Sequence, residues 1–194
     1  MPDRPGSVLT GVSYGAVVRH ADPRGSFREL WRASADPSGG FPVERSGTVG
    51  AHFVQANLSV SAAGVLRGLH LHRRQLDRWV VATGRAFVAL VDVRPPLAGD
   101  GPPRVETRQL EADDWVEIPV GVAHGFLALE PLELVYFVTA EFDDTDEHGF
   151  AWDDPVVGVP WPDPIPGTPD GRPILSERDR GNPPLAELVA RLRG

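Results

Sequence analysis

Short runs in which apolar and polar side chains alternate follow one another through the middle of the chain. Alternation with a period of two is the pattern of a β-strand that buries one face. Glycine, proline, aspartate or charged residues bound each run, as expected of turns. The pattern predicts strands at about residues 50–60, 65–72, 78–82, 86–93, 104–110, 115–118, 124–129 and 132–140. So many short strands indicate an all-β sandwich or jelly-roll barrel.

Three segments depart from this alternation. Residues 94–103 carry paired prolines and glycines, which predict a surface loop. Residues 153–173 are rich in proline and predict an irregular extended segment that wraps the barrel. Leu185 and Leu188 begin a helical spacing of apolar residues, which predicts a short C-terminal helix over residues 184–192.

The composition supports one domain built mainly from strands. The chain has 194 residues, of which 41% are hydrophobic, enough for one sizeable core. Its 21 glycines and 20 prolines are spread throughout, as turns between many strands require. We expect a single domain with an N-terminal arm at about 1–50, a barrel at about 50–142, and a wrapping segment with the C-terminal helix at about 143–194.

Charge and cysteine content exclude several classes of function. A net charge of −8 argues against nonspecific binding of nucleic acid, which needs a basic surface. The chain has no cysteine and therefore no disulfide, thiolate nucleophile or zinc–thiolate site. No apolar run approaches the length that crosses a membrane, and the first residues lack the apolar core of a signal peptide. We expect a cytoplasmic protein without a membrane or nucleic-acid partner.

The segment from Gly64 to His72 holds the strongest sign of a functional site. It reads Gly-Val-Leu-Arg-Gly-Leu-His-Leu-His within a predicted strand. Because successive side chains of a strand face opposite ways, His70 and His72 share one face, while Leu69 and Leu71 share the other. A turn of proline and glycine brings His124 into a second strand. Histidines from two separate strands fit a small barrel with a central site.

The spacing of these histidines resembles the two motifs of the cupin superfamily. The motifs here are His70-x-His72 with Asp77 five positions later, and Pro119-x-Gly121-x-x-His124. In metal-binding cupins these positions supply three histidines and a glutamate to one divalent metal. The resemblance therefore implies one alternative for this chain, a metal site formed by His70, His72, Asp77 and His124.

A wider set of motifs resembles the dTDP-4-dehydrorhamnose 3,5-epimerase family. Six segments carry the resemblance in the family's order: Arg24–Glu29, Phe53–Ser59, Gly64–His70, Ile118–Phe126, Trp152–Pro162 and Leu175–Asp179. Together they cover about residues 20 to 180. The resemblance implies a cupin-type jelly roll that binds a nucleotide-diphosphate sugar, dTDP-linked in the family, and needs no cofactor. It also implies an isomerase that inverts carbons beside the C4 ketone of a 4-keto-6-deoxy sugar.

The resemblance assigns catalytic roles to three residues. His70 matches the general base, a role that suits an imidazole titrating near neutral pH. Asp179 matches the aspartate that pairs with this histidine. Tyr136 matches the tyrosine that returns a proton from the opposite side of the sugar. From the residues alone, Tyr136 is equally explained as a buried tyrosine of the core.

Further positions match residues that bind the substrate in the family. Arg24 and Arg67 match positions that hold the diphosphate, for which guanidinium groups are suited. Gln55 and Asn57 match polar positions of the sugar and nucleotide cleft. The complete set of predicted substrate-binding residues is Arg24, Phe27, Glu29, Gln55, Asn57, Arg67, His72, Asp77 and His124.

Asp77 departs from the family pattern at a position that bears on catalysis. A lysine, whose charge can stabilise an enolate, is usual in the family where this chain has Asp77. A carboxylate would repel an enolate, and Arg74 or Arg78 are the neighbouring residues that can replace the lysine. We therefore expect a divergent member with a changed reaction or substrate, acting at C3, C5 or both.

Two other activities remain open on the sequence. A sugar 3,4-ketoisomerase is suggested because related enzymes carry a His-x-His pair on the equivalent strand. A metal-dependent cupin oxygenase or hydrolase would use His70, His72, Asp77 and His124. The epimerase resemblance also implies a homodimer in which Arg24 of one subunit faces His70 of the other.

Overall fold

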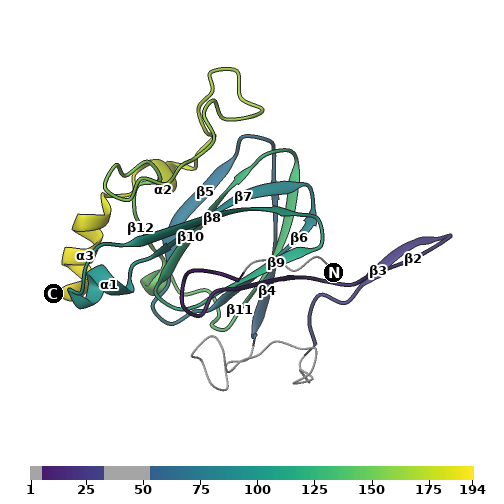
Figure 1. Ribbon diagram of the computed structural model, residues 1–194, viewed down its shortest axis with the longest axis horizontal. Helices are drawn as coiled ribbons and strands as arrows, with labels where there is room; N and C mark the ends of the chain where they lie inside the picture. The colour runs from purple at the N-terminus through teal and green to yellow at the C-terminus, as the bar shows by residue number, and fades with distance from the viewer. Residues whose placement is uncertain (1–5, 33–52) are drawn as a thin grey trace.

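Two five-stranded antiparallel sheets form the body of the protein in a computed structural model, which describes residues 6–32 and 53–194 (Figure 1). The strands of the first sheet are β1 (Ser13–Ala16), β4 (Gln55–Ser61), β6 (Asp77–Thr83), β9 (Asp114–Ile118) and β11 (Leu132–Val138). Those of the second are β5 (Leu66–Leu71), β7 (Arg85–Asp92), β8 (Arg104–Glu111), β10 (Val122–Ala128) and β12 (His148–Gly149).

The strand order confirms the predicted all-β jelly roll. The first sheet has the order β1-β9-β6-β11-β4, and the second has the order β12-β5-β10-β7-β8. From β4 to β12, successive strands alternate between the two sheets, as in a jelly roll, except that β7 and β8 form a hairpin within the second sheet. Each of the eight predicted strands corresponds to one of β4 to β11 within a few residues. Residues 50–52, at the start of the first predicted strand, lie outside the described residues.

The main core fills the space between the two sheets. It consists of side chains that alternate inward along the strands, including Val81, Leu90, Ile118, Phe126 and Leu134. Strand β10 is buried along its whole length because the facing sheet covers one side and other segments cover the other. A central strand covered on both faces is a rigid base for His124.

Helices and the C-terminal segment cover the outer face of the second sheet. Helix α3 (Leu185–Arg193) confirms the predicted C-terminal helix, and its fully buried Leu188 packs in a cluster with Leu71 of β5. Residues 153–173 form neither strand nor helix, as predicted. Among the described residues, no helix has the length and apolar character needed to span a bilayer.

The predicted loop at residues 94–103 is wrong over its first half. Helix α1 (Arg94–Ala98) occupies this part, and it packs beside α3 (Figure 1). Prolines stand in its first turn, where the missing N–H groups have no partner within the helix. The prolines that indicated a loop are therefore compatible with the start of a helix.

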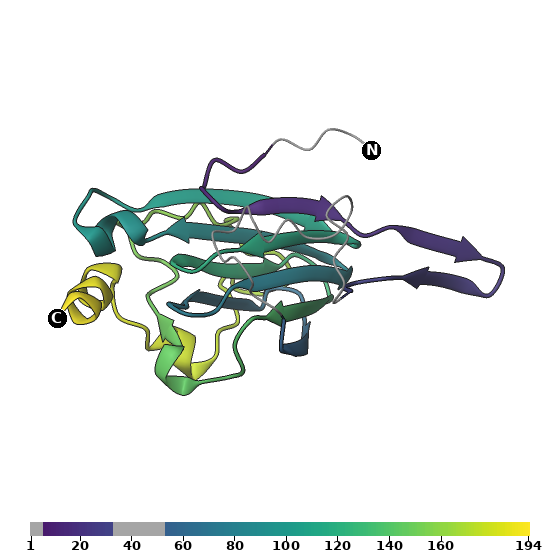
Figure 2. The ribbon, with the colours of Figure 1, turned by 90° about the horizontal axis from the view of Figure 1, so that it is seen from below.

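A two-stranded hairpin extends away from the body (Figures 1 and 2). It consists of β2 (Arg19–Asp22) and β3 (Gly25–Arg28) and pairs with neither large sheet. Asp113 anchors its base, since its carboxylate accepts hydrogen bonds from Arg19 Nε at 2.7 Å and from Arg28 Nη1 at 2.6 Å. The predicted arm at about 1–50 lies partly outside the described residues.

Strand β4 is the edge of the first sheet and reverses the usual orientation of polar and apolar residues. Gln55, Asn57 and Ser59 are partly buried, whereas Leu58 and Val60 are more than half exposed. An exposed apolar row on an edge strand is typical of a surface that another chain covers.

Candidate active site

A pocket of about 290 Å³ lies between the two sheets and collects residues from both. Its lining includes six of the predicted site residues: Arg67, His70, His72, Asp77, His124 and Tyr136. Strands β5 and β10 of one sheet supply His70 and His124, and β6 and β11 of the other supply Asp77 and Tyr136. Polar side chains therefore replace the apolar core at this end of the barrel.

A bulge in β5 places Arg67 and His70 on the same side. His124 of β10 pairs with His70, and Phe126 pairs with Arg67. The three residue steps from Arg67 to His70 on β5 therefore lie opposite only two steps, from His124 to Phe126, on β10. The extra residue reverses the alternation, which would otherwise direct the two side chains to opposite faces. Both Arg67 and His70 consequently line the pocket.

The predicted pairing of His70 with Asp179 is present. His70 Nε2 lies 2.7 Å from Asp179 Oδ1, and the aspartate is buried. Asp179 lies on the short helix α2 (Glu177–Arg180), whose first turn is capped by the Ser176 side chain. Although burial acts to raise the pKa of Asp179, the hydrogen bond and charge of His70 lower it below its usual value. The aspartate is therefore ionised at neutral pH and favours an Nε2–H tautomer of His70, which leaves the lone pair on Nδ1.

A second group of buried side chains lies deeper in the pocket. His72, Asp77 and His124 place one potential ligand atom each within 4.8 Å of one another. The Nε2 atom of His124 is 3.5 Å from Asp77 Oδ2, and the ring centroids of the two histidines are 5.3 Å apart. Burial lowers the pKa of His124 to about 4, despite the opposing effect of Asp77. His124 is consequently neutral at physiological pH.

Tyr136 is half-buried on the sheet that faces His70. Burial raises the pKa of its hydroxyl above the usual value. The negative charges of Asp77 and Glu147 add to this effect, and Arg67 opposes it. The hydroxyl therefore stays protonated at neutral pH and can donate a proton into the pocket.

Five predicted substrate-binding residues lie outside this pocket in the single chain. Arg24 and Phe27 are exposed on the hairpin, where Arg24 forms an ion pair with the adjacent Asp22. Glu29 pairs with Arg32 just beyond the hairpin. Gln55 and Asn57 share a hydrogen bond on β4, four and two residues before Ser59, which does line the pocket.

Neither arginine proposed to replace the family lysine lines the pocket. Arg74 is more than half exposed and pairs with Asp143. Arg78 is buried on the opposite face of β6, where its guanidinium stacks on Trp115 and lies 3.6 Å from Glu117. Arg74 and Arg78 therefore bring no cation into the pocket beside Asp77.

Among the lining residues that the sequence did not indicate as site residues are Glu147, Arg178 and Gln75. Glu147 and Arg178 form an ion pair of 2.7 Å at the pocket, and Gln75 donates a hydrogen bond to Asp77. Glu147 and Arg178 come from segments after the barrel, so no spacing within a strand indicated them. Gln75 lies only two residues before Asp77, and this proximity was the one available signal.

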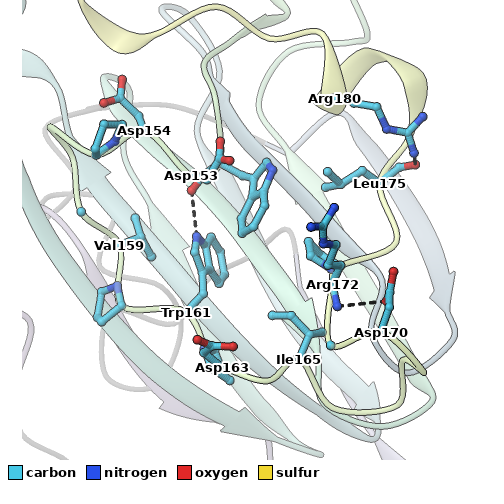
Figure 3. A pocket seen from close by; sticks show the side chains of 17 residues that line it. Asp153, Asp154, Val159, Trp161, Asp163, Ile165, Asp170, Arg172, Leu175 and Arg180 are labelled. Atoms are coloured by element: carbon cyan, nitrogen blue, oxygen red, sulfur yellow. Dashed lines mark hydrogen bonds between the residues drawn. The ribbon is translucent and has the colours of Figure 1, made fainter.

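A larger hollow of about 920 Å³ is formed by the C-terminal segment itself, with all its lining residues between Trp152 and Arg180 (Figure 3). None of its 17 lining residues is a histidine or tyrosine. Trp161 Nε1 donates to the Trp152 carbonyl at 2.8 Å, and Asp170 accepts from the Arg172 backbone N–H, so these polar groups already have partners (Figure 3). The smaller pocket holds the groups suited to acid–base chemistry.

Comparisons with known proteins agree with the motifs. A family model described as dTDP-4-dehydrorhamnose 3,5-epimerase matches residues 7–187. The spore coat polysaccharide biosynthesis protein SpsL of Bacillus subtilis (strain 168) is 34% identical over 155 residues, which are 78% of this chain and 95% of SpsL. The dTDP-4-dehydrorhamnose 3,5-epimerase of Methanothermobacter thermautotrophicus is 34% identical over 171 residues, covering 87% of this chain and 86% of the relative.

Solved structures show the same fold. The epimerase RmlC of Legionella pneumophila in complex with dTDP-4-keto-L-rhamnose superposes with a TM-score of 0.78 at 26% identity, covering 96% of this chain and 94% of RmlC. ChmJ, a 3'-monoepimerase of Streptomyces bikiniensis in complex with dTDP-quinovose, has a TM-score of 0.73 at 27% identity and covers 97% and 98% of the two chains. These similarities confirm the predicted cupin-type jelly roll.

Proposed function

The chain belongs to the dTDP-4-dehydrorhamnose 3,5-epimerase family, and on this premise we propose that it is an isomerase that inverts C3, C5 or both in a nucleotide-diphosphate 4-keto-6-deoxy sugar. The observation that carries the proposal is the contact of 2.7 Å between His70 and Asp179, with Tyr136 on the facing sheet. The proposed nucleotide is dTDP, because relatives of this fold bind dTDP-linked sugars.

In the proposed reaction, His70 removes the proton beside the ketone. The lone pair of Nδ1 takes the proton from C3 or C5, and the electrons of the C–H bond move to the C4 oxygen, giving an enolate. Asp179 stabilises the resulting imidazolium through the hydrogen bond at Nε2. This pairing of a base with an orienting carboxylate is a general device for making an imidazole a competent base.

Tyr136 returns a proton to the opposite face of the same carbon. Inversion needs an acid and a base on opposite sides of the sugar ring, and the two sheets supply one each. The raised pKa of Tyr136 keeps its hydroxyl protonated until the enolate forms. When the enolate collapses, the tyrosine proton moves to carbon. Solvent then restores the phenol and takes up the proton that His70 removed.

The diphosphate is proposed to bind at the arginines of the pocket rim. Arg67 lines the pocket on β5, and its guanidinium suits phosphate oxygens. The exposed Arg24 reaches a pocket only if the hairpin extends to a second chain. Gln55 and Asn57 are proposed to contact the sugar or nucleotide, since they lie on the strand that carries the pocket residue Ser59.

We propose that the protein acts as a homodimer. Two observations support it. The hairpin projects from the body (Figure 2) and its Phe27 is exposed, and β4 presents Leu58 and Val60 to solvent. A second copy that added its arm to the β4 edge would bury this apolar row and bring Arg24 toward the partner's pocket. Light scattering should give twice the monomer mass.

Deuterium incorporation tests the activity directly. Purified protein in D₂O, supplied with a dTDP-4-keto-6-deoxyhexose, should exchange deuterium into C3 or C5, which NMR reads separately. His70→Asn should abolish exchange, whereas His148→Asn, a histidine outside the pocket, should retain it. No exchange by the wild type would contradict the proposal, and a 3-keto product without inversion would indicate a ketoisomerase.

A further inference from the structure

The buried end of the pocket gathers hydrogen-bond acceptors from three segments. His72 follows β5 directly, Asp77 begins β6 and His124 lies in β10. All three side chains are buried, and one nitrogen or oxygen atom from each lies within 4.8 Å of the other two. We propose that this cluster binds the ammonium group of an amino sugar, so that the substrate is a nucleotide-diphosphate 3-amino-4-keto-6-deoxy sugar. The assignment rests on the proposed function, whose substrate class it narrows.

Backbone carbonyls fix the tautomer of both imidazoles. His72 Nδ1 lies 3.1 Å from the Asp146 carbonyl, and His124 Nδ1 lies 3.2 Å from the Val122 carbonyl. Because a carbonyl oxygen only accepts, each neutral ring carries its proton on Nδ1 and a lone pair on Nε2. Both Nε2 atoms are therefore acceptors, and the pocket that the two rings line is short of donors at this end.

The Asp77 carboxylate is held by neutral donors. Gln75 Nε2 donates to Oδ1 at 2.7 Å, and Trp79 Nε1 donates to Oδ2 at 3.2 Å. Each oxygen keeps a further lone pair for a ligand. Among the described residues, the one ionisable group of opposite type in contact with Asp77 is His124, whose Nε2 lies 3.5 Å from Oδ2. A neutral imidazole offers only a lone pair there, and a buried carboxylate without a cation is costly.

The arginines that line the pocket contact other groups. Arg67 Nε donates to the Ser61 hydroxyl at 3.2 Å, and Arg178 Nη1 donates to Glu147 Oε2 at 2.7 Å. Within the part of the chain that the structure describes, neither arginine forms an ion pair with Asp77. A positive charge beside this carboxylate therefore has to come from the ligand.

An ammonium group matches this set of acceptors. A primary ammonium has three N–H donors and no acceptor, like the head of a lysine. Acceptors that bind one such nitrogen at about 2.9 Å lie roughly 4 to 5 Å apart, and the three atoms here lie within 4.8 Å of one another. Asp77 Oδ2 and His124 Nε2, at 3.5 Å, can share one N–H in a bifurcated bond. A hydroxyl has a single donor and leaves the carboxylate without a counter-charge.

The neighbourhood of the cluster places the amine beside the ketone. Besides burial, the charge of Asp77 raises the pKa of the Tyr136 hydroxyl, so the cluster borders the proposed acid. The carbons next to C4 are C3 and C5, and C5 of a 6-deoxy pyranose already carries the methyl group and the ring oxygen. An amine beside the ketone is therefore on C3. Its charge lies next to the C4 oxygen and stabilises the enolate, which in the resembling family is the task of a lysine.

Two sugar nucleotides that lack the ketone test the amine subsite without turnover. In calorimetry at pH 7 with a chelator present, the wild type should bind dTDP-3-amino-3,6-dideoxyglucose at least about 10-fold more tightly than dTDP-6-deoxyglucose. Asp77→Asn keeps the shape of the side chain but removes its charge, and it should abolish this preference. His72→Phe removes a second acceptor and should reduce it. Asp100→Asn, an exposed carboxylate outside the pocket, should retain it.

The affinity for dTDP alone serves as the folding control, since it should be equal in the wild type and the three variants. A wild type that binds the two sugar nucleotides equally, or binds the 3-hydroxy sugar more tightly, would overturn the inference. So would a preference for the amine that persists undiminished in Asp77→Asn.

Deuterium exchange separates this inference from the proposed function. The two substrates are dTDP-4-keto-6-deoxyglucose and its 3-amino counterpart, each supplied in D₂O. A preference for the amine that depends on Asp77, without exchange into either sugar, supports the subsite and removes the epimerase. Exchange without a preference for the amine supports the epimerase and removes the subsite. If both hold, the 3-amino sugar should exchange with the higher kcat/KM, and Asp77→Asn should remove that advantage.

Discussion

His70 and Asp179 are separated by 109 residues in the chain, and their side chains meet at 2.7 Å between Nε2 and Oδ1. The contact joins the barrel to helix α2 of the C-terminal segment. That segment therefore orients the proposed base besides covering the sheet.

Replacing Asp179 by asparagine should slow turnover with little effect on substrate affinity. The amide cannot stabilise the imidazolium, and it permits the wrong tautomer of His70. We expect kcat to fall by about 10²- to 10⁴-fold, whereas the dissociation constant for dTDP, measured by calorimetry, stays within a few fold. Asp153→Asn, a carboxylate outside the pocket, is the control. Unchanged kcat in Asp179→Asn would remove the proposed pairing from the mechanism.

Replacing Tyr136 by phenylalanine should separate exchange from inversion. His70 remains able to remove a proton and return one from solvent on the same face. Deuterium should therefore enter the substrate while its configuration is retained. NMR of the recovered sugar measures both, and Tyr14→Phe, the other tyrosine of the chain, should behave as the wild type. Normal inversion by Tyr136→Phe would assign the acid role to another group.

Mixed dimers should show whether the hairpin serves the neighbouring subunit. If Arg24 completes the partner's site, Arg24→Ala and His70→Asn each inactivate the protein, but a dimer of the two variants has one intact site. Co-expression should restore about a quarter of wild-type activity, because about half of the dimers are mixed and each mixed dimer has one intact site out of two. Co-expression of His70→Asn with Tyr136→Phe should restore none, since both residues belong to one chain's pocket. Equal recovery in both mixtures would contradict the shared site.

The strands of the barrel could be predicted because their periodicity is local. Each strand alternates and ends in a turn, so its signal lies within its own residues. Helix α1 was missed because Pro95 and Pro96 indicate a turn as readily as a first helical turn. Helix α2 has only four residues, too few to show a period, and its Asp179 was assigned through the family resemblance.

The arrangement of the pocket depended on contacts that no single segment encodes. Simple alternation directs Arg67 and His70 to opposite faces, and only the register with β10 reveals the bulge that unites them. Glu147 lies at the pocket because the chain after the barrel folds back over it. The sequence motif grouped His70 with His72, Asp77 and His124. In the structure the last three lie close together, whereas His70 is hydrogen-bonded to Asp179.

The anchor of the hairpin should depend on pH through Asp113. Burial acts to raise the pKa of this carboxyl, but hydrogen bonds and charges from Arg19 and Arg28 outweigh it and lower the pKa below its usual value. A depressed pKa in the folded state contributes stability that is fully present above the ordinary carboxyl pKa of about 3.9 and is lost as pH falls through the folded value.

Comparison of the wild type with Asp113→Asn measures this contribution. Asparagine tolerates the positive φ of 78° at this position, so the backbone need not change. The wild type should have the larger free energy of unfolding in urea at pH 7, and the difference should shrink below about pH 4. Added salt should also reduce the difference, since Arg19 and Asp113 are partly exposed. A difference that stays constant from pH 7 to pH 3 would show that the two arginines do not stabilise the ionised carboxylate.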